Sequence, residues 1–325
     1  MVRPFAQMSG ARVTIGIPTR NRAAQLDRAL QSALAQHGVE VQVVVSDNAS
    51  TDGTRALCEA MAAADGRLKV LRHDVDIGAE RNFQSVLDVA SGSMFMWLAD
   101  DDWIDPGYVA ACVAVLDEHP DHALVCGRGR YYREGSYAFS ERPVNLLSGS
   151  SRTRLLGFYR TVGLNSTFYG VMRRALLVQT PIAPGLASDW LLVAGTAWSG
   201  KIRTIEAVSI HRSFEGASGD HASLARAYEI PAWKAWHVHL VVGARVCRDV
   251  WSASPYTTAN RLERLALGAL CGMVVIVRYW PRAMVALALA KLGWLGHARR
   301  RLEERRRSRE RLSPPGGEGS PPGST

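Results

Sequence analysis

Short apolar runs alternate with segments of helical periodicity from residue 13 to about residue 128. Residues 13–17, 41–45 and 94–98 are almost continuously apolar, as are strands that are buried on both faces of a sheet. Between the first two runs, leucines recur every four residues, which is typical of a helix. This alternation predicts an α/β fold in which a mostly parallel sheet is flanked by helices.

The remaining strands and helices are predicted from the same apolar and helical patterns. Further strands are expected at 69–71, 123–126, 167–172 and 201–210. Helices are expected at 23–36, 53–64, 82–90, 106–118, 173–178 and 191–198. Asp52 and Asp105 precede two of these helices and are candidate N-caps. From about Leu224 onward the composition predicts a helical extension.

Three polar clusters follow the three apolar runs, at residues 18–22, 46–51 and 100–102. Ligands of parallel α/β sheets bind beyond the carboxyl ends of the strands, so these clusters are predicted to line one site. The last cluster is three consecutive aspartates, which repel one another unless a positive group lies nearby. A divalent cation shared with a diphosphate is one such group. A solvated acidic turn before a helix is the alternative.

Four short motifs lie in order over residues 13–128: Ile-Pro-Thr-Arg-Asn-Arg at 17–22, Asp-Asn-Ala-Ser at 47–50, Gly-Ala-Glu-Arg-Asn at 78–82, and Asp-Asp-Asp at 100–102. Together they resemble the nucleotide-sugar domain of family 2 glycosyltransferases, which implies the Rossmann-like GT-A fold. Within that family they are most similar to bacterial polysaccharide-type transferases. Two positions depart from the family pattern. Arg20 stands where many members have tyrosine, and Ala99 stands where an acid often begins the Asp-x-Asp motif.

The resemblance implies a nucleotide-sugar donor, with UDP-, dTDP- and GDP-sugars left open. It assigns donor binding to Pro18, Thr19, Arg20, Asn21, Asp47, Asn48, Arg81 and Asp100. Asp47 is expected to accept a hydrogen bond from a base N–H. Arg81 is expected to bind the diphosphate through its guanidinium fork, with a solvated surface arginine as the alternative.

The resemblance also implies a Mn²⁺ or Mg²⁺ cofactor, which neutralises the leaving diphosphate. The expected metal residues are Asp101, Asp102 and His211. Asp101 is the first choice, by alignment with the later acid of the Asp-x-Asp motif. Asp102 is either a second ligand or an orienting residue. His211 follows the expected strand at 201–210, and a purely structural histidine is the alternative.

A weaker match, Ser188-Asp189-Trp190, resembles the segment that carries the catalytic base of the family. Asp189 would take the proton of the acceptor hydroxyl while that hydroxyl attacks the anomeric carbon from the opposite face. A single displacement of this kind inverts the stereochemistry. Helix N-capping is the alternative for Asp189. Residues 165–167 match a glycosylation sequon, but no role is assigned to them because residues 1–12 show no secretory signal.

Two apolar runs, at 265–277 and 283–295, stand out in the C-terminal region. Each is shorter than the roughly 20 residues that span a bilayer. Between residues 299 and 311 there are eight arginines and three glutamates, a net +5 within a chain of net charge +9. An apolar segment followed by such a basic run favours binding to an anionic membrane surface, with ordinary core helices as the alternative. Nucleic acid is not an expected partner.

These observations divide the chain into an N-terminal tail (1–12), a nucleotide-sugar half (13–128), an acceptor-binding half (129–222), a helical extension (223–298), and a basic, disordered tail (299–325). The predicted function is inverting, metal-dependent transfer of a sugar to a saccharide acceptor, lipid-linked, in cell-surface polysaccharide synthesis. Five scattered cysteines without metal-ligand spacing fit a reducing cytoplasm, so the expected location is the inner face of the cell membrane. The alternatives are a sugar-nucleotide nucleotidyltransferase and a non-catalytic binding protein of polysaccharide assembly.

Overall fold

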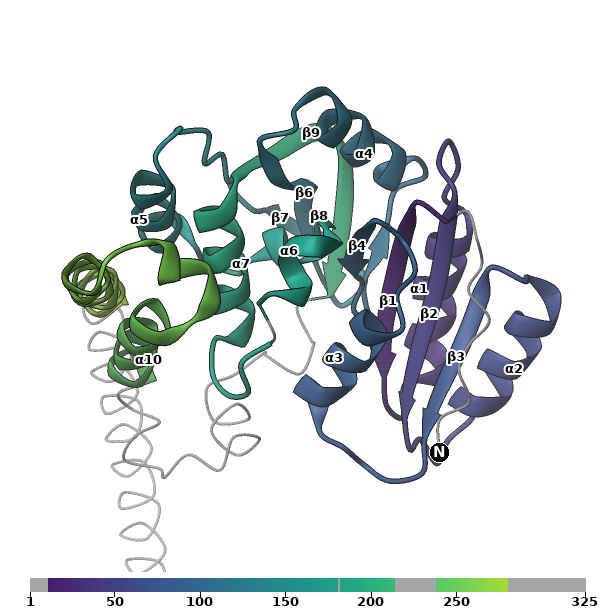
Figure 1. The fold of residues 1–325 in the computed structure, drawn as a ribbon. Helices are drawn as coiled ribbons and strands as arrows, with labels where there is room; N and C mark the ends of the chain where they lie inside the picture. The colour runs from purple at the N-terminus through teal and green to yellow at the C-terminus, as the bar shows by residue number, and fades with distance from the viewer. Residues whose placement is uncertain (1–10, 181, 214–237, 280–325) are drawn as a thin grey trace, which may run out of the picture. The chain divides into compact units, whose positions relative to one another are not determined.

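The computed structural model describes residues 11–180, 182–213 and 238–279 (Figure 1). Contacts group the chain into a large unit that ends at Ile276 and a second unit from Val277 onward. Of the second unit, only residues 277–279 are described. The apolar run at 283–295 and the basic run at 299–311 therefore lie outside the described residues.

The first half of the large unit is a parallel α/β sheet, as the sequence predicts. Its strands run in the order β3-β2-β1-β4, and the pairs within this order are parallel. In chain order the elements are β1 (Val13–Thr19), α1 (Ala23–Leu34), β2 (Val41–Asn48), α2 (Thr54–Ala64), β3 (Leu68–His73), α3 (Ala79–Asp88) and β4 (Met94–Trp97).

The second half extends the same sheet with strands of mixed direction. The order continues β4-β8-β6-β9-β5, with β7 paired to β6. Strand β8 is antiparallel to both β4 and β6, whereas β6 and β9 are parallel. The elements are β5 (Trp103–Ile104), α4 (Tyr108–Glu118), β6 (His122–Arg133), β7 (Ser136–Ser140), α5 (Ser151–Thr161), η1 (Ser166–Tyr169), β8 (Val171–Arg173), α6 (Arg174–Val178), α7 (Ser188–Ser199) and β9 (Lys201–Ser213). Strand β6 runs across residue 128, so the two predicted halves share one sheet.

Three local predictions were wrong. Asp52 was expected to cap the helix at 53–64, but the N-cap of α2 is Gly53, and Asp52 accepts from the Thr54 N–H over 3.0 Å. Residues 167–172 were expected to form a strand, but they begin with the 3₁₀ turn η1 and only β8 is extended. Asp105 was expected to cap the following helix, but that helix starts after Gly107, which has a left-handed φ of 79°. The Asp105 side chain instead accepts hydrogen bonds from the Ser209 N–H and the His211 ring.

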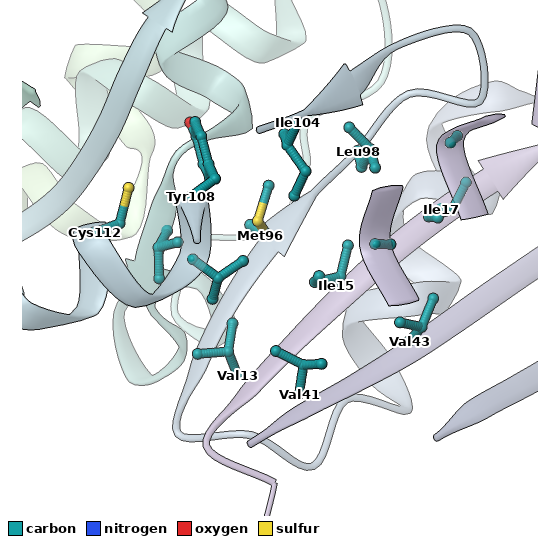
Figure 2. Close-up of a cluster of buried hydrophobic side chains, with 14 of the residues drawn as sticks. Val13, Ile15, Ile17, Val41, Val43, Met96, Leu98, Ile104, Tyr108 and Cys112 are labelled. Atoms are coloured by element: carbon teal, nitrogen blue, oxygen red, sulfur yellow. The ribbon is translucent and has the colours of Figure 1, made fainter. Parts of the chain in front are cut away.

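A cluster of buried apolar side chains fixes the sheet against the helices on one face (Figure 2). Side chains of β1, β2 and β4 meet those of α1 and α4 there, among them Ile15, Val43, Met96 and Cys112. On the other face α3 lies so close to β1 that a Cβ on Gly16 would approach a Val86 methyl to 2.6 Å. With helices tight on both faces, the polar residues that follow the strands are left at the rim of the sheet.

The described C-terminal part is helical, as expected. It consists of α10 (Val238–Ser252), the 3₁₀ turn η2 (Ser254–Thr258) and helical residues 261–279. Gly243 and Gly272 let two of these helices approach closely, since a Cβ on Gly272 would lie 2.7 Å from the Gly243 carbonyl oxygen. Within the described ranges, no helix has both the length and the apolar character needed to cross a bilayer.

Candidate active site

The loops that follow β1, β2 and β4 meet at one edge of the sheet, where the three polar clusters were predicted to gather. The Thr19 hydroxyl donates to Asp100 over 2.8 Å, which joins the ends of β1 and β4. Asn21 accepts a hydrogen bond from the Thr51 N–H (2.8 Å), which joins the loops after β1 and β2. The Asn82 amide donates to the carbonyl oxygens of Thr19 and Ser46, at 3.3 and 3.1 Å, and so ties the ends of the two strands together.

The three consecutive aspartates make different contacts. Asp100 is 8% exposed, and burial raises the pKa of its carboxyl group to about 6 although Arg22 opposes the shift. The carboxylate of Asp101 accepts from the Arg22 guanidinium over 2.7 Å. Asp102 is buried and accepts from the Arg212 guanidinium and the Ser213 N–H, both at 3.1 Å. Burial raises the pKa of Asp102, and Arg212 counteracts that shift.

Arg22 provides a positive charge at this edge of the sheet. Its guanidinium lies 2.7 Å from Asp101 and 3.5 Å from Asp100. The two carboxylates therefore already hold a cationic group, and their oxygens are the ligands that Mg²⁺ and Mn²⁺ prefer. Among the described residues, no three acidic, histidine or cysteine side chains converge in a metal-binding group. Mg²⁺ usually takes one or two carboxylates and completes its shell with water and substrate phosphates, so the donor set fits an ion shared with a diphosphate.

The predicted donor-binding residues on β2 contact neighbouring loops. Asp47 is 1% exposed, accepts from the Ser50 N–H over 3.0 Å and pairs with Arg72 of the adjacent strand β3. Asn48 donates to Asp76 over 2.6 Å and accepts from the Ile77 N–H over 2.9 Å. These contacts fix the shape of the loops after β2 and β3.

The other predicted donor-binding residues differ in exposure. Pro18 is buried within β1, whereas Arg81 is exposed in the first turn of α3. Arg20 is exposed and forms an ion pair with Asp76, the same carboxylate that binds Asn48. Arg20 and Asn48, predicted from separate motifs, therefore meet at one acidic residue that the sequence analysis did not single out.

Both ring nitrogens of His211 are hydrogen-bonded within the protein. Nε2 lies 2.7 Å from the Asp105 carboxylate and Nδ1 lies 3.0 Å from the Tyr132 hydroxyl. The ring also stacks on Trp103, with centroids 5.0 Å apart and planes 5° apart. The structure therefore favours the structural alternative for His211, and His211 is not part of a metal-ligand cluster in the described ranges.

Asp189 lies in the first turn of α7 and is half-buried. The N-cap residue of that helix is Ala187, in the left-handed region with φ 59°, so Asp189 is not itself the N-cap. Burial raises the pKa of Asp189, while a hydrogen bond from the Asn165 amide (2.8 Å to Oδ2) lowers it. A carboxyl group with a raised pKa is suited to accept a proton.

Arg212 connects the acidic cluster with the segment that holds Asp189. Its guanidinium donates to Asp102, to the Tyr131 hydroxyl (2.7 Å) and to the Leu164 carbonyl oxygen (3.0 Å). The residue after Leu164 is Asn165, which binds Asp189. One partly buried cation, Arg212, therefore links the two acidic centres, although they are far apart in the sequence.

Sequence reasoning assigned no role to Arg22, Arg212 or Asn165. Arg22 was quoted within the first motif, and Asn165 was noted only within a glycosylation sequon. Arg212 follows His211 at the end of an expected strand, which was the available signal for it. The arrangement as a whole places two carboxylates that pair with an arginine at the rim of the sheet, and a separate half-buried carboxylate, Asp189, whose raised pKa suits proton transfer.

Comparison with known proteins identifies the family. The sequence profile described as Glycosyl transferase family 2 matches residues 14–179, which is just over half of the chain.

Two relatives with glycosyltransferase names are similar over part of the sequence. The GalNAc(5)-diNAcBac-PP-undecaprenol beta-1,3-glucosyltransferase of Campylobacter jejuni is 27% identical over 51% of this chain and 53% of its own length. A PGL/p-HBAD biosynthesis glycosyltransferase of Mycobacterium bovis is 31% identical over 37% of this chain and 47% of its own length. The chain thus spans about half the length of these curated relatives.

Solved structures agree on the fold. The crystal structure of S. aureus TarS 1-349 in complex with UDP-GlcNAc superposes with a TM-score of 0.60 at 17% identity, over 82% of this chain and 73% of that one. A further crystal structure of S. aureus TarS 1-349 gives a TM-score of 0.57. At this level of identity the similarity concerns the fold alone, and it confirms the expected GT-A architecture.

Proposed function

The chain belongs to glycosyltransferase family 2, and from that premise we propose that it transfers a sugar from a nucleotide-sugar donor to a hydroxyl group of a lipid-linked saccharide acceptor. The observation that carries the proposal is the presence of two acidic centres linked through Arg212: Asp100 and Asp101, which pair with Arg22, and a half-buried Asp189 with a raised pKa. Asp100 and Asp101 suit a site for the diphosphate leaving group, and Asp189 suits removal of a proton from the acceptor.

The donor binds at the edge of the sheet beyond β1, β2 and β4. Thr19 and Asp100, already hydrogen-bonded to each other, contact the ribose. The end of β2 holds the base through Asp47 and Asn48, and Pro18, Arg20 and Asn21 at the end of β1 complete the donor site. Asp47 is paired with Arg72, so its carboxylate must exchange that partner for a base N–H, or Arg72 must contact the base in its place. Arg81 is exposed at the start of α3 and meets the diphosphate.

Asp101 would hold the divalent cation, and Asp100 would share it or bind the ribose. Bound to these carboxylates and to the diphosphate, Mn²⁺ or Mg²⁺ would neutralise the charge that the leaving group gains. Arg22 pairs with both carboxylates, so it would compete with an ion for them. Asp102 serves as an orienting residue because its two oxygens are bound to Arg212 and to the Ser213 N–H.

Asp189 acts as the general base. The proton of the acceptor hydroxyl passes to the Asp189 carboxylate as the hydroxyl oxygen forms a bond to the anomeric carbon. The bond between that carbon and the diphosphate oxygen breaks, and its electron pair leaves with the nucleoside diphosphate. Attack from the face opposite to the leaving group inverts the configuration at the anomeric carbon.

An exposed apolar face on helical residues 261–279 supports binding to a membrane surface. Leu262, Leu265, Leu270 and Met273 are 80%, 58%, 47% and 56% exposed. Their spacing of three to five residues places them on one side of the helix. A helix of this kind lies in the membrane interface rather than across the bilayer, and the clustered arginines of the tail add attraction to anionic lipids. A lipid-linked acceptor in the membrane, of the kind named for the C. jejuni relative, would then be within reach at the cytoplasmic face.

The experiment that tests the proposal is an assay of the full chain with a panel of UDP-, dTDP- and GDP-sugars, Mn²⁺ and an undecaprenyl-diphosphate-linked saccharide. We expect release of a nucleoside diphosphate with one donor and a product of inverted anomeric configuration. Exchange of pyrophosphate into a nucleoside triphosphate would instead identify a nucleotidyltransferase. Binding of donors without turnover, under every condition of the panel, would identify a non-catalytic binding protein.

A further inference from the structure

The side-chain amide of Asn165 contacts the carboxylate of Asp189. The residue is 3% exposed, and its Nδ2 donates to Asp189 Oδ2 over 2.8 Å. Its carbonyl oxygen Oδ1 is buried and has no hydrogen-bond partner among the described residues. Because both atoms belong to one amide group, this unpartnered acceptor lies beside the carboxylate proposed as the base.

The backbone around Asn165 is held by two charged side chains. The Glu141 carboxylate accepts from the Asn165 and Ser166 N–H groups, both at 3.0 Å. Arg212 donates to the Leu164 carbonyl oxygen over 3.0 Å. Asn165 itself has a φ of 58°, in the left-handed region that asparagine tolerates better than most residues. The amide is therefore built into a fixed position.

The orientation of the amide follows from chemistry. An ionised carboxylate only accepts hydrogen bonds, so the atom that faces Asp189 must be the NH₂ group. A flipped amide would set two acceptor oxygens against each other. Oδ1 is thus the atom without a partner, and a buried acceptor left unsatisfied is costly enough to be rare in native proteins. A ligand hydroxyl that binds beside Asp189 would satisfy it.

We propose that Asn165 is a positioning residue for Asp189 and that its carbonyl oxygen accepts a hydrogen bond from a hydroxyl group of the saccharide acceptor. The inference rests on the proposed function, in which Asp189 is the base. By binding Oδ2, the amide fixes the rotation of the carboxylate that receives the proton. Asn165 is chemically unchanged in the step.

The glycosylation sequon at 165–167 lies inside the protein. The Asn165 nitrogen, which would carry a glycan, is buried and bonded to Asp189. Ser166 is also buried, and its hydroxyl lies 3.0 Å from that of Tyr131. The asparagine therefore serves the site from inside the protein.

Removal of the amide should change the pH dependence of turnover in a defined direction. The groups that favour the ionised form of Asp189 are the Asn165 amide, the backbone N–H groups of Trp190 and Asp189, and Arg212 from β9. Tyr169 from η1 also interacts with Asp189, which raises the pKa of the tyrosine. Burial raises the pKa of Asp189 and the amide lowers it. Without the amide, the effect of burial is less opposed, so the pKa of Asp189 rises. Because the base must be ionised, the acidic limb of the pH–rate profile moves to higher pH.

The decisive variant is Asn165→Gly, because glycine adopts the left-handed region without strain and so removes the side chain while it keeps the backbone. Loss of a hydrogen bond to a charged group predicts a fall in kcat of roughly 10- to 100-fold. We also expect a higher KM for the acceptor, an unchanged KM for the donor, and the shifted acidic limb. Asn165→Asp should shift the limb further, since two carboxylates then face each other.

The matched control is Glu134→Gly, which replaces another left-handed residue, in the turn between β6 and β7. It should keep the wild-type pH profile. An Asn165→Gly enzyme with wild-type kcat and an unmoved acidic limb would overturn the inference. So would an equal loss of rate at every pH together with a lower Tm, which would mark a purely structural residue. A wild-type protein that transfers no sugar from any donor would refute the proposed function instead, and the two failures are thus distinguishable.

Discussion

Replacement of Asp100 by asparagine should stabilise the fold while it impairs the site. Burial raises the pKa of this carboxyl group to about 6 from its ordinary 3.8. At about 1.4 kcal/mol per pKa unit, the ionised form at neutral pH is disfavoured by roughly 3 kcal/mol in the folded protein. The side chain is only 11% exposed, so solvent screens little of this cost. Asp100→Asn should recover up to about 3 kcal/mol in the free energy of unfolding at pH 7.5.

The pH dependence gives the sharper test. Between pH 3.8 and about 6 the folded state binds more protons at Asp100 than the unfolded state does. The contribution of this group to the free energy of unfolding therefore falls as the pH rises through that window. Below the window both states are protonated, so the advantage of the asparagine variant should vanish near pH 4.

The assay is urea unfolding of both proteins at pH 4 and pH 7.5, without metal or donor. Asp88→Asn, an exposed position on α3, controls for the loss of one negative charge from a chain of net charge +9. The reasoning is refuted if Asp100→Asn destabilises at pH 7.5, or if its effect is the same at both pH values. Either result would mean that the Arg22 and Thr19 contacts outweigh the burial of the charge.

Four further outcomes are expected. Asp101→Asn should keep the fold but abolish sugar transfer and weaken Mn²⁺ binding, as followed by electron paramagnetic resonance of the free ion; near-normal turnover would remove Asp101 from the metal site. Asp189→Asn should lower the transfer rate by on the order of 10² or more with donor affinity nearly unchanged; a fall in donor affinity with normal turnover would show a different role. Arg212→Met should cost about 3–5 kcal/mol in urea unfolding, because a buried carboxylate loses its partner; a variant as stable as wild type would contradict the linking role. Glutamine at the six arginines of 299–301 and 305–307 should weaken binding to anionic liposomes, by about 1 kcal/mol for each arginine near the surface, but not to neutral ones; equal binding by both proteins would exclude the electrostatic contribution.

Several features of the fold could be predicted from the sequence because they depend on local patterns. Apolar runs of strand length and leucines at helical spacing predicted the parallel sheet of β1 to β4. The rule that strand ends meet at one edge placed Thr19 and Asp100 together, and their hydrogen bond confirms it. The direction of β8 and the 3₁₀ turn η1 were not predicted. A short strand carries the same apolar pattern in either direction, and the turn depends on the left-handed Asn165 and on the close approach of Gly170 to β6.

The pairing of charged side chains was decided by the tertiary structure. Arg22 and Asp101 are 79 residues apart, and Asp102 and Arg212 are 110 residues apart. The sequence marked the acidic cluster as a place that needs positive charge, but it could not say which of 39 lysines and arginines supplies it. The strand order determines which arginines pair with the aspartates, because β4 lies beside β1 and the chain returns along β9 to the same edge. The link from Asp102 through Arg212 to Asn165 and Asp189 exists only once the sheet has brought these distant segments together.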